Sequence, residues 1–401
     1  MLEQSDSILV TMKVLILGAG AVGGWFGGKL VEYLQQQQQQ GGGGDDDIEK
    51  EEDPNHPVEV TFLVRSGRAS QLESDGLILD DLYNKTKCSV RDVPCLISGT
   101  ASSINNSGST IVHEESNPTN EDTATTTTTR FDVIILACKS YGLGGSLEAI
   151  APYVYPGVAI LPLLNGMSHL QTIQEKFPQS TVWGGTCGIV ASLNKETGII
   201  SKQTGATWVK FGIQRSSTSS GSDNDDDPQQ DHHLSLMETL ASTWKLSGIE
   251  AEHIKDGKIS QAMWNKWIFL ASLGASVCLW QGTTGDIVRT NYGEELVLVM
   301  IKECERVAHA EQRSDNEEER SSNTEPSPTT ITYETIKKNF LHADSLFKTS
   351  MGRDMDQGFP TESSHLIGDL IVRAKRHDIN TPLLCASYTR LQIYESKRLP
   401  S

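Results

Sequence analysis

Three glycines near the N-terminus have the spacing of a nucleotide-binding loop. Gly18, Gly20 and Gly23 form the pattern G-x-G-x-x-G within KVLILGAGAVGGWF. The pattern directly follows a short apolar run and directly opens a helical one, which is the context that pyrophosphate binding at a helix N-terminus requires. An ordinary tight turn is the alternative, because the pattern alone often occurs by chance. The context favours a dinucleotide loop made of Gly18, Ala19, Gly20, Ala21, Val22 and Gly23.

The end of the second expected strand bears on which dinucleotide binds. The stretch VEVTFLVRSGR places Arg65 and Arg68 where an enzyme that uses NAD normally carries Asp or Glu for the ribose 2′-hydroxyl. A guanidinium can instead form charge-assisted hydrogen bonds with a 2′-phosphate. We therefore expect NADPH or NADP as the cofactor, with Arg65 in contact with it. Two solvated loop arginines are the alternative.

Composition limits the other partners. The chain has 401 residues and a formal net charge of −18, which argues against nucleic acid or an acidic membrane surface as the main partner. The seven cysteines are scattered without a C-x-x-C pair, which predicts reduced thiols and no metal site. The first residues do not resemble a signal peptide, and no apolar run is long enough for a membrane span. We expect a soluble, cytoplasmic protein.

Four stretches have too few apolar residues to contribute to a core. They cover about 35–56, 99–130, 214–232 and 312–330, and they are rich in Gln, Gly, Ser, Thr, Asp and Glu. Such composition predicts solvated loops inserted between the folded elements. The poly-Gln tract would then lie between the first helix and the second strand.

The remaining chain alternates strands and helices up to residue 213. Buried strands are expected at 13–18, 58–65, 131–139, 157–166 and 180–193, with a β-like stretch at 88–97 and helices at 21–34, 67–76 and 145–154. A period-2 stretch at 198–213 predicts an antiparallel hairpin at the sheet edge. This order predicts an α/β domain, a Rossmann-type doubly wound sheet over 12–213.

After residue 233 the pattern becomes helical. The stretches at 233–248, 260–280, 293–311, 333–344 and 363–378 all show a helical period. The sequence therefore predicts an all-α C-terminal domain over 234–398. The active site is expected in the cleft between the two domains.

Six motifs occur in an order that resembles the ketopantoate reductase family, the 2-dehydropantoate 2-reductases. They are GAGAVGG at 18–24, ACKSY at 137–141, LLNGM at 163–167, WGGTCGIV at 183–190, MWNKW at 263–267 and FPTESSHLIGDLIVRAKRHDINTP at 359–382. The resemblance spans nearly the whole chain apart from the insertions and the ends. It implies reduction of 2-dehydropantoate to pantoate by NADPH, a step of pantothenate and coenzyme A biosynthesis. A homodimer is compatible with the sequence, which carries no signal for oligomeric state.

The resemblance identifies two catalytic residues in the helical half. Lys266 matches the family's catalytic lysine, and its place on the apolar stretch AMWNKWIFLASL makes an unpaired ammonium costly. Hydride attack on a carbonyl creates an alkoxide, which needs a proton donor or a positive field. Glu362 matches the acidic residue that contacts the substrate and helps to hold the lysine. The alternatives are a lysine that extends to solvent and a surface glutamate at a helix N-terminus.

Three further residues match polar positions of the family. Lys139 and Asn165 follow expected parallel strands, and the resemblance places them beside the nicotinamide ribose, with Asn165 also contacting the substrate. Ser350 precedes Glu362 by the separation that the family's carboxylate-binding serine has. For Asn165, the alternative is ordinary Asn-Gly turn chemistry.

The chain departs from the family at three positions. Leu270, Gly274 and Phe347 stand where the family often has Asn, so hydrogen bonds to the substrate are lost and the pocket should be more apolar. Two alternatives to ketopantoate reduction follow. One is a reductase of the same fold for a more apolar 2-oxo acid, and the other is a non-catalytic sensor of pyridine nucleotides.

Overall fold

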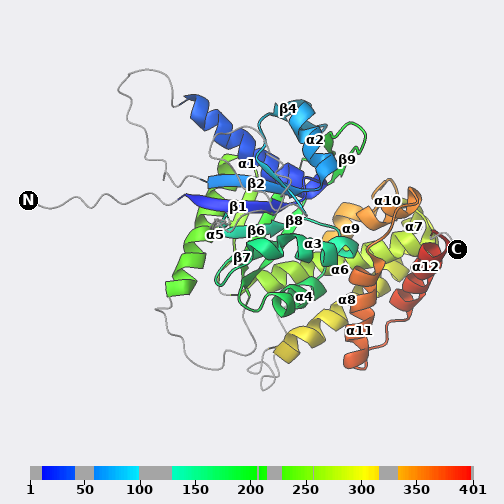
Figure 1. Cartoon of the computed structure of the whole chain (residues 1–401). Coiled ribbons are helices and arrows are strands. Elements are labelled where there is room, and N and C mark those ends of the chain that lie inside the picture. Colours follow the sequence, from blue (N-terminus) through cyan, green and yellow to red (C-terminus); the bar gives the residue numbers. More distant parts are fainter. Residues whose placement is uncertain are drawn as a thin grey trace, which may run out of the picture.

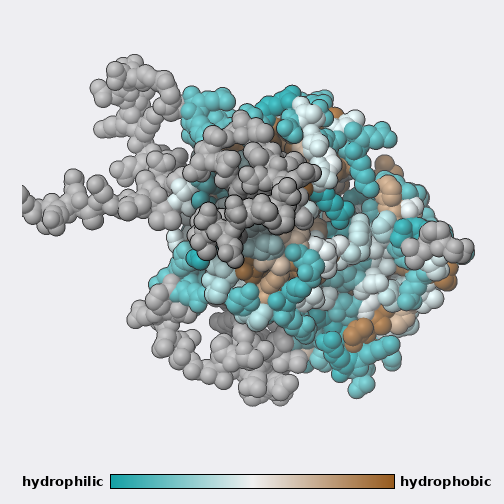
Figure 2. Space-filling view, viewed as in Figure 1, coloured by the Kyte–Doolittle hydropathy of each residue, from teal (hydrophilic) through white to brown (hydrophobic). Residues whose placement is uncertain are grey.

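The computed structural model describes residues 11–40, 58–98, 129–205, 207–214, 228–255, 257–315 and 333–398. A domain built on a β-sheet carries the N-terminal half of the chain, and a cluster of helices carries the C-terminal half (Figure 1). On the face shown in Figure 2, hydrophilic residues predominate over the described parts and apolar residues form separate areas. The acidic composition is thus matched by a largely polar surface on this face.

The main sheet has eight strands in the order β12-β11-β8-β7-β6-β1-β2-β5. From β5 to β8 neighbouring strands are parallel, β11 runs antiparallel to β8, and β12 runs parallel to β11. This topology confirms the predicted Rossmann-type doubly wound sheet. The strands are β1 Met12–Leu17, β2 Val58–Val64, β5 Cys95–Ile97, β6 Val133–Leu136, β7 Ala159–Pro162, β8 Thr181–Gly188, β11 Trp208–Ile213 and β12 Glu250–His253.

Helices bury both faces of this sheet. Along β1, Val14 and Ile16 face one apolar cluster, whereas Leu15 and Leu17 face another, as expected for a parallel strand that is covered on both sides. The first cluster includes side chains of α1 and α5, and the second includes side chains of α3 and α4. The helices of this domain are α1 Ala21–Gln40, α2 Ser66–Asp75, α3 Leu143–Ile150, α4 Ser168–Lys176 and α5 Pro228–Leu246.

A second, four-stranded sheet lies beside the first and was not predicted. Its order is β4-β3-β10-β9, formed by Thr86–Val90, Leu77–Asp81, Ile200–Lys202 and Ala191–Leu193. The predicted hairpin over 198–213 is therefore wrong, because β10 and β11 belong to different sheets. The period-2 pattern correctly indicates half-buried strands, but it cannot say which strands pair.

Three of the predicted insertions are shorter than the composition suggests. The helix α1 continues through Gln40, and the Gln35 side chain donates a 2.7 Å hydrogen bond to the Arg91 carbonyl. The helix α5 begins at Pro228, a residue well suited to a first helical turn, and α8 continues to Asp315. Apart from residues 129–130 and 214, the rest of the four predicted loops lies outside the described residues.

The helical domain is organised around one central helix. This helix, α6 Ile259–Trp280, is apolar on all sides and packs against α8, α10 and α12. The other elements are α7 Thr284–Val288, α8 Gly293–Asp315, α9 Tyr333–Phe340, α10 Ser350–Asp356, a π-helical turn η4 Ser364–Gly368, α11 Asp369–Arg376 and α12 Pro382–Arg398. The prediction that the C-terminal domain is helical is confirmed.

The boundary between the domains lies later than expected. The helix α5 packs on α1 within the core of the sheet domain, and β12 extends the main sheet next to β11. The predicted division, with one domain ending at 213 and the next beginning at 234, would therefore separate α5 and β12 from the sheet domain to which they belong. By its contacts, the helical domain begins with α6 at Ile259.

Candidate active site

The glycine loop after β1 has the geometry that a dinucleotide requires. A Cβ atom at Gly23 would lie 2.2 Å from the Gly18 carbonyl oxygen, so this helix can approach the loop only with glycine there. A Cβ atom at Gly20 would meet nothing within 4 Å, which leaves the loop backbone open to a ligand. Ala21 and Val22 form the first turn of α1, whose N-terminus favours an anion. The loop therefore fits the pyrophosphate of a dinucleotide.

The two arginines after β2 differ in their surroundings. Arg65 is exposed at the N-cap of α2, directly after the strand. Arg68 is half-buried, and its guanidinium donates hydrogen bonds to the Ala19 carbonyl at 3.1 Å and to the Gly198 carbonyl at 3.2 Å. Burial lowers the pKa of the Arg68 guanidinium. Arg68 thus supports the glycine loop, whereas Arg65 is the arginine available to a ligand.

Three of the expected site positions, and Cys187, lie at the carboxyl ends of neighbouring parallel strands. The glycine loop follows β1, Lys139 follows β6, Asn165 follows β7, and Cys187 lies near the end of β8. Ligands of doubly wound folds bind at this edge of the sheet. The sheet therefore brings together the residues that the sequence analysis assigned to the cofactor.

Lys266 reaches the same edge from the helical domain. Its ammonium donates a hydrogen bond to the backbone carbonyl of Cys187, and its side chain is half-buried on α6. Both Lys266 and Glu362 lie in the described part of the chain, and no hydrogen bond joins them there. The expectation that Glu362 holds Lys266 is therefore not met in this structure.

Glu362 instead pairs with Lys139 across the cleft. The Lys139 ammonium lies 3.4 Å from Glu362 Oε2 and 3.1 Å from Asp354 Oδ2. The Ser140 amide donates to Glu362 Oε1 at 2.9 Å, and the Glu362 side chain is only 5% exposed. Partial burial opposes the charge on Lys139, but the two carboxylates prevail and raise the pKa of its ammonium. A buried carboxylate is thus satisfied by groups from the opposite domain.

Asp354 is a site residue that the sequence analysis missed. It follows Ser350 by one helical turn on α10, so the two side chains share the face that approaches Lys139. Ser350 itself is the first residue of α10, and Thr349 caps this helix by accepting from the Gly352 amide. A search for acidic residues one turn from Ser350 would have found Asp354.

Two of the three departures from the family motif, Phe347 and Gly274, lie next to apolar side chains. The Phe347 ring packs against Phe340 and Phe269, with ring centroids 4.6 Å and 5.9 Å away. Phe269 lies one turn after Lys266 on α6. A Cβ atom at Gly274 would lie 2.7 Å from the Met351 methyl group, so a larger residue there would have to displace that side chain. The loss of amides is therefore accompanied by apolar packing.

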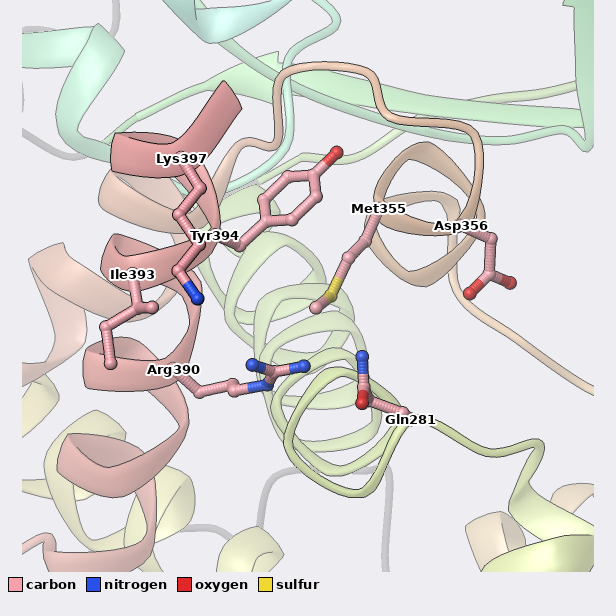
Figure 3. Close-up of a pocket in the computed structure, with 7 residues that line it drawn as sticks. All are labelled: Gln281, Met355, Asp356, Arg390, Ile393, Tyr394 and Lys397. Carbon is pink, nitrogen blue, oxygen red and sulfur yellow. The ribbon is translucent and has the colours of Figure 1, made fainter. Parts of the chain in front are cut away.

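A separate hollow of about 420 Å³ lies between α10 and α12, next to the end of α6 (Figure 3). Side chains of α10 and α12 and Gln281 at the end of α6 line it. None of the expected catalytic or cofactor residues contributes to this hollow, so we place the candidate active site in the interdomain cleft and not here. Within the described ranges, no helix is long and apolar enough to cross a membrane.

Family models match most of the chain outside the first strands. The model described as "Ketopantoate reductase PanE/ApbA" matches residues 86–215, and the one described as "Ketopantoate reductase PanE/ApbA C terminal" matches residues 258–395. The chain belongs to the ketopantoate reductase family. It is accordingly an oxidoreductase that acts on a CH–OH group, and this family binds NAD(P)H.

Among curated proteins of known sequence, two are similar to this family member. "Uncharacterized oxidoreductase YkpB" of Bacillus subtilis is 29% identical over 387 residues, which cover 96% of this chain and 100% of that protein. A 2-dehydropantoate 2-reductase of Halobacterium salinarum is 24% identical over 253 residues, covering 63% of this chain and 72% of that protein.

Solved structures of ketopantoate reductases share the fold. A 2-dehydropantoate 2-reductase from Methylococcus capsulatus superposes with a TM-score of 0.68 at 19% identity, covering 97% of this chain and 99% of that one. A D-mandelate dehydrogenase in complex with NADH and anilino(oxo)acetate gives a TM-score of 0.66 at 19% identity, covering 96% and 99%. These likenesses support the two-domain fold that the sequence predicted.

Proposed function

We propose that the protein reduces a 2-oxo acid to the corresponding 2-hydroxy acid with NADPH. The observation that carries this proposal is the position of Lys266, which contacts the Cys187 carbonyl near the end of β8. Lys266 therefore lies at the edge of the sheet where the glycine loop, Lys139 and Asn165 also lie. A cation held near a bound dinucleotide is what carbonyl reduction requires.

Each residue has a defined part in this proposal. A bound nicotinamide cofactor would supply the hydride. Lys266 donates a proton, or a positive field, to the oxygen that becomes an alkoxide. Asn165 contacts the cofactor and the substrate, and Ser350 binds the substrate carboxylate. Glu362 contacts the substrate while it holds Lys139 and the Ser140 amide.

Arg65 makes NADPH the preferred cofactor in this proposal. The guanidinium is exposed directly after β2, where the 2′-position of the ribose lies in folds of this type. Arg68 takes the smaller part in this role, because its Nε and Nη1 already donate to backbone carbonyls and only its buried Nη2 has no partner in the described chain.

Ketopantoate is the first substrate of the proposal, in pantothenate and coenzyme A biosynthesis. The Halobacterium salinarum relative carries the name of that activity. A more apolar 2-oxo acid is the second candidate, because the Phe269, Phe340 and Phe347 rings pack together next to the helix that carries Lys266. The fold is shared with a D-mandelate dehydrogenase whose structure contains anilino(oxo)acetate, an aromatic compound, which supports testing aromatic acids as well.

The experiment is a panel of 2-oxo acids, each assayed with NADPH and with NADH by nicotinamide absorbance. The panel should include ketopantoate, branched aliphatic acids and phenylglyoxylate. Turnover of ketopantoate at the highest kcat/KM supports the first candidate, and a preference for apolar acids supports the second. Tight NADPH binding with no turnover of any acid would instead indicate a pyridine-nucleotide sensor.

We also propose a homodimer located in the cytoplasm. A structurally similar ketopantoate reductase from Staphylococcus aureus is described as dimeric, with a TM-score of 0.60. Light scattering of the purified full chain tests the oligomeric state, and imaging of a tagged chain in its own cells tests the location.

A further inference from the structure

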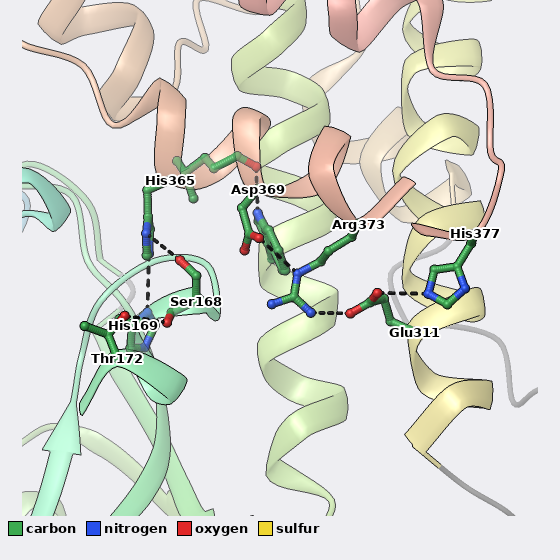
Figure 4. A network of polar contacts seen from close by, with 10 residues as sticks. Ser168, His169, Thr172, Glu311, His365, Asp369, Arg373 and His377 are labelled. Carbon is green, nitrogen blue, oxygen red and sulfur yellow. Dashed lines mark hydrogen bonds and ion pairs between the residues drawn. The ribbon is translucent and has the colours of Figure 1, made fainter. Parts of the chain in front are cut away.

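Two histidines from opposite domains contact each other. His169 lies on α4 of the sheet domain, and His365 lies on the π-helical turn η4 of the helical domain. Their ring nitrogens, His169 Nδ1 and His365 Nε2, are 3.3 Å apart, and His365 Nδ1 is 3.0 Å from Ser168 Oγ (Figure 4). We call Ser168, His169 and His365 the histidine latch.

The contacts of the latch assign the tautomers of both neutral rings. His169 is fully buried, and its Nε2 has no hydrogen-bond partner. A buried N–H without a partner costs more than an unused lone pair, so the proton belongs on His169 Nδ1, which donates to His365 Nε2. His365 then carries its proton on Nδ1 and donates to Ser168 Oγ. This chain of bonds requires a neutral His365, because its Nε2 must accept from His169.

The latch is packed against the turn that carries Asn165. A Cβ atom at Gly166 would lie 3.1 Å from the His365 ring, and Gly166 has a φ of +78°. The backbone of Asn165 also interacts with the His365 ring and favours its protonated form. Only glycine fits between this ring and the turn, so His365 determines where the backbone next to Asn165 lies.

The same helical turn contacts the other catalytic parts. Glu362 precedes His365 by one turn and pairs with Lys139. The Leu366 carbonyl accepts a 2.9 Å hydrogen bond from the Trp267 indole, and Trp267 directly follows Lys266. The short segment 362–366 therefore contacts Lys139 directly. It also contacts Gly166 and Trp267, the residues that follow Asn165 and Lys266. Single π-helical turns of this kind occur often at functional sites.

We infer that His365 is a positioning residue, which fixes the Asn165 turn of one domain relative to Glu362 and Lys266 of the other. This inference rests on the proposed function for the roles of those three residues. The latch itself is a structural claim about His365, Ser168 and His169 and can be tested without a substrate.

Protonation should open the latch. A second proton on His365 would go to Nε2 and would place an N–H donor against the Nδ1–H donor of His169. The charged groups around the pair are Lys266, Glu362, Asp369 and Arg373. Burial lowers the pKa of both rings, and the neighbouring ring and Lys266 lower that of His169 further, whereas Glu362 and Asp369 act against the shift of His365. Both rings are therefore neutral at neutral pH, and the hydrogen bonds of the latch are formed.

Hydrogen exchange of the full chain tests the latch through the amides of residues 160–176. His365→Leu should speed exchange in this segment about tenfold, whereas His365→Gln, which can still donate and accept, should keep most of the protection. His377→Gln is the matched control, because this histidine lies apart from the latch (Figure 4). Its Nε2 is 2.9 Å from Glu311 Oε1. Unchanged exchange in His365→Leu would overturn the inference.

The pH dependence separates a titrating latch from simple packing. After correction for intrinsic exchange, the wild type should lose protection of 160–176 on acidification, and His365→Gln should lose this dependence. The same pH dependence in both proteins would overturn the inference, even if His365→Leu fails to fold.

Kinetics with an accepted 2-oxo acid then tests the positioning role. His365→Leu should lower kcat about tenfold, with an NADPH Kd close to that of the wild type, and His365→Gln should restore most of the loss at neutral pH. A kcat of wild-type size in a folded His365→Leu protein removes the positioning role. A wild type that reduces no acid at all would contradict the proposed function, while the exchange results would still decide the latch.

Discussion

Glu362 and Ser140 connect the two domains, since Glu362 Oε1 accepts a 2.9 Å hydrogen bond from the Ser140 amide. Ser140 opens the short helical turn after β6, and Glu362 directly precedes the segment that carries His365. The same carboxylate lies 3.4 Å from the Lys139 ammonium. A charge that belongs to the helical domain is therefore stabilised by the sheet domain, which couples the arrangement of the two domains to the geometry of their charged groups.

Glu362→Gln should weaken the contact between the two domains without leaving a cavity, because glutamine has nearly the same size as glutamate. The amide can still accept from Ser140, but the charge is gone and Lys139 keeps only Asp354 as an acidic partner. We expect a loss of about 1–2 kcal/mol in the free energy of unfolding, measured by urea denaturation. The control is Glu148→Gln, whose exposed pair with Lys176 should contribute less than about 0.5 kcal/mol. Equal losses in both variants would contradict the coupling.

Lys266→Met should separate chemistry from folding. The methionine keeps the apolar stem but cannot donate to the Cys187 carbonyl or to an alkoxide. Because general acid catalysis contributes about 10²- to 10⁴-fold, kcat should fall by that factor while the NADPH Kd stays the same. The comparison is Lys302→Met, an exposed lysine on α8, which should retain full activity. A Lys266→Met protein with wild-type kcat would exclude this lysine from the mechanism.

Arg65→Ala and Arg68→Ala should affect cofactor binding in different ways. Loss of Arg65 removes a charge-assisted contact, so NADPH affinity should fall about 10- to 100-fold and NADH affinity should not change. Loss of Arg68 removes the support of Ala19 and Gly198, so both cofactors should bind more weakly and the melting temperature should fall. Fluorescence titration with each cofactor measures these effects. If only Arg68→Ala weakened NADPH binding and left NADH binding unchanged, Arg68 and not Arg65 would be the residue that contacts the 2′-phosphate.

Local patterns predicted most elements, and long-range contacts account for what was missed. The glycine loop, the alternation of strands and helices in the sheet domain and the helix of Lys266 follow from short stretches of sequence. The partner of Glu362 does not, because Lys139 lies in another domain and its distance depends on how α10 and η4 pack. The roles of Arg68 and His365 were missed for the same reason, since Ala19, Gly198 and Ser168 are distant in sequence.

The poly-Gln tract shows the opposite kind of error. Composition assigned residues from 35 onward to a loop, but glutamine has a good helix propensity and α1 simply continues through it. The Gln35 contact with the Arg91 carbonyl gives the extended helix one attachment. Low complexity is therefore not by itself a reason to end a helix.

His169 should make stability dependent on pH. Burial, His365 and Lys266 lower the pKa of its imidazole to about 3 from the ordinary value of 6.5. Between about pH 6.5 and pH 3, this imidazole is protonated in the unfolded chain but neutral in the folded chain. The free energy of unfolding therefore decreases as the pH falls through this range. Between pH 6.5 and pH 5 the loss should be about 2 kcal/mol. Urea unfolding at each pH measures it, and His169→Phe should show a smaller slope than the wild type. An identical slope would mean that other groups cause the acid sensitivity.

Phe347→Asn should change the choice of substrate. The family often has Asn at this position, and the Phe347 ring packs with Phe340 and Phe269 one turn from Lys266. An amide would offer a hydrogen bond to a polar substrate and would remove apolar contact area from a nonpolar one. The ratio of kcat/KM for ketopantoate to that for the best apolar acid should therefore rise about tenfold or more.

Stability and selectivity can be separated with a second variant in the same cluster. Phe340→Leu removes a ring that contacts Phe347, so it should destabilise the cluster by about 1–2 kcal/mol while the substrate ratio stays near that of the wild type. Both ratios are measured with the same two acids at saturating NADPH. If Phe340→Leu shifts the ratio as far as Phe347→Asn does, selectivity depends on the packing of the whole cluster. If neither shifts it, the rings do not contact the substrate, and the preference must come from the α6 face that carries Leu270 and Gly274.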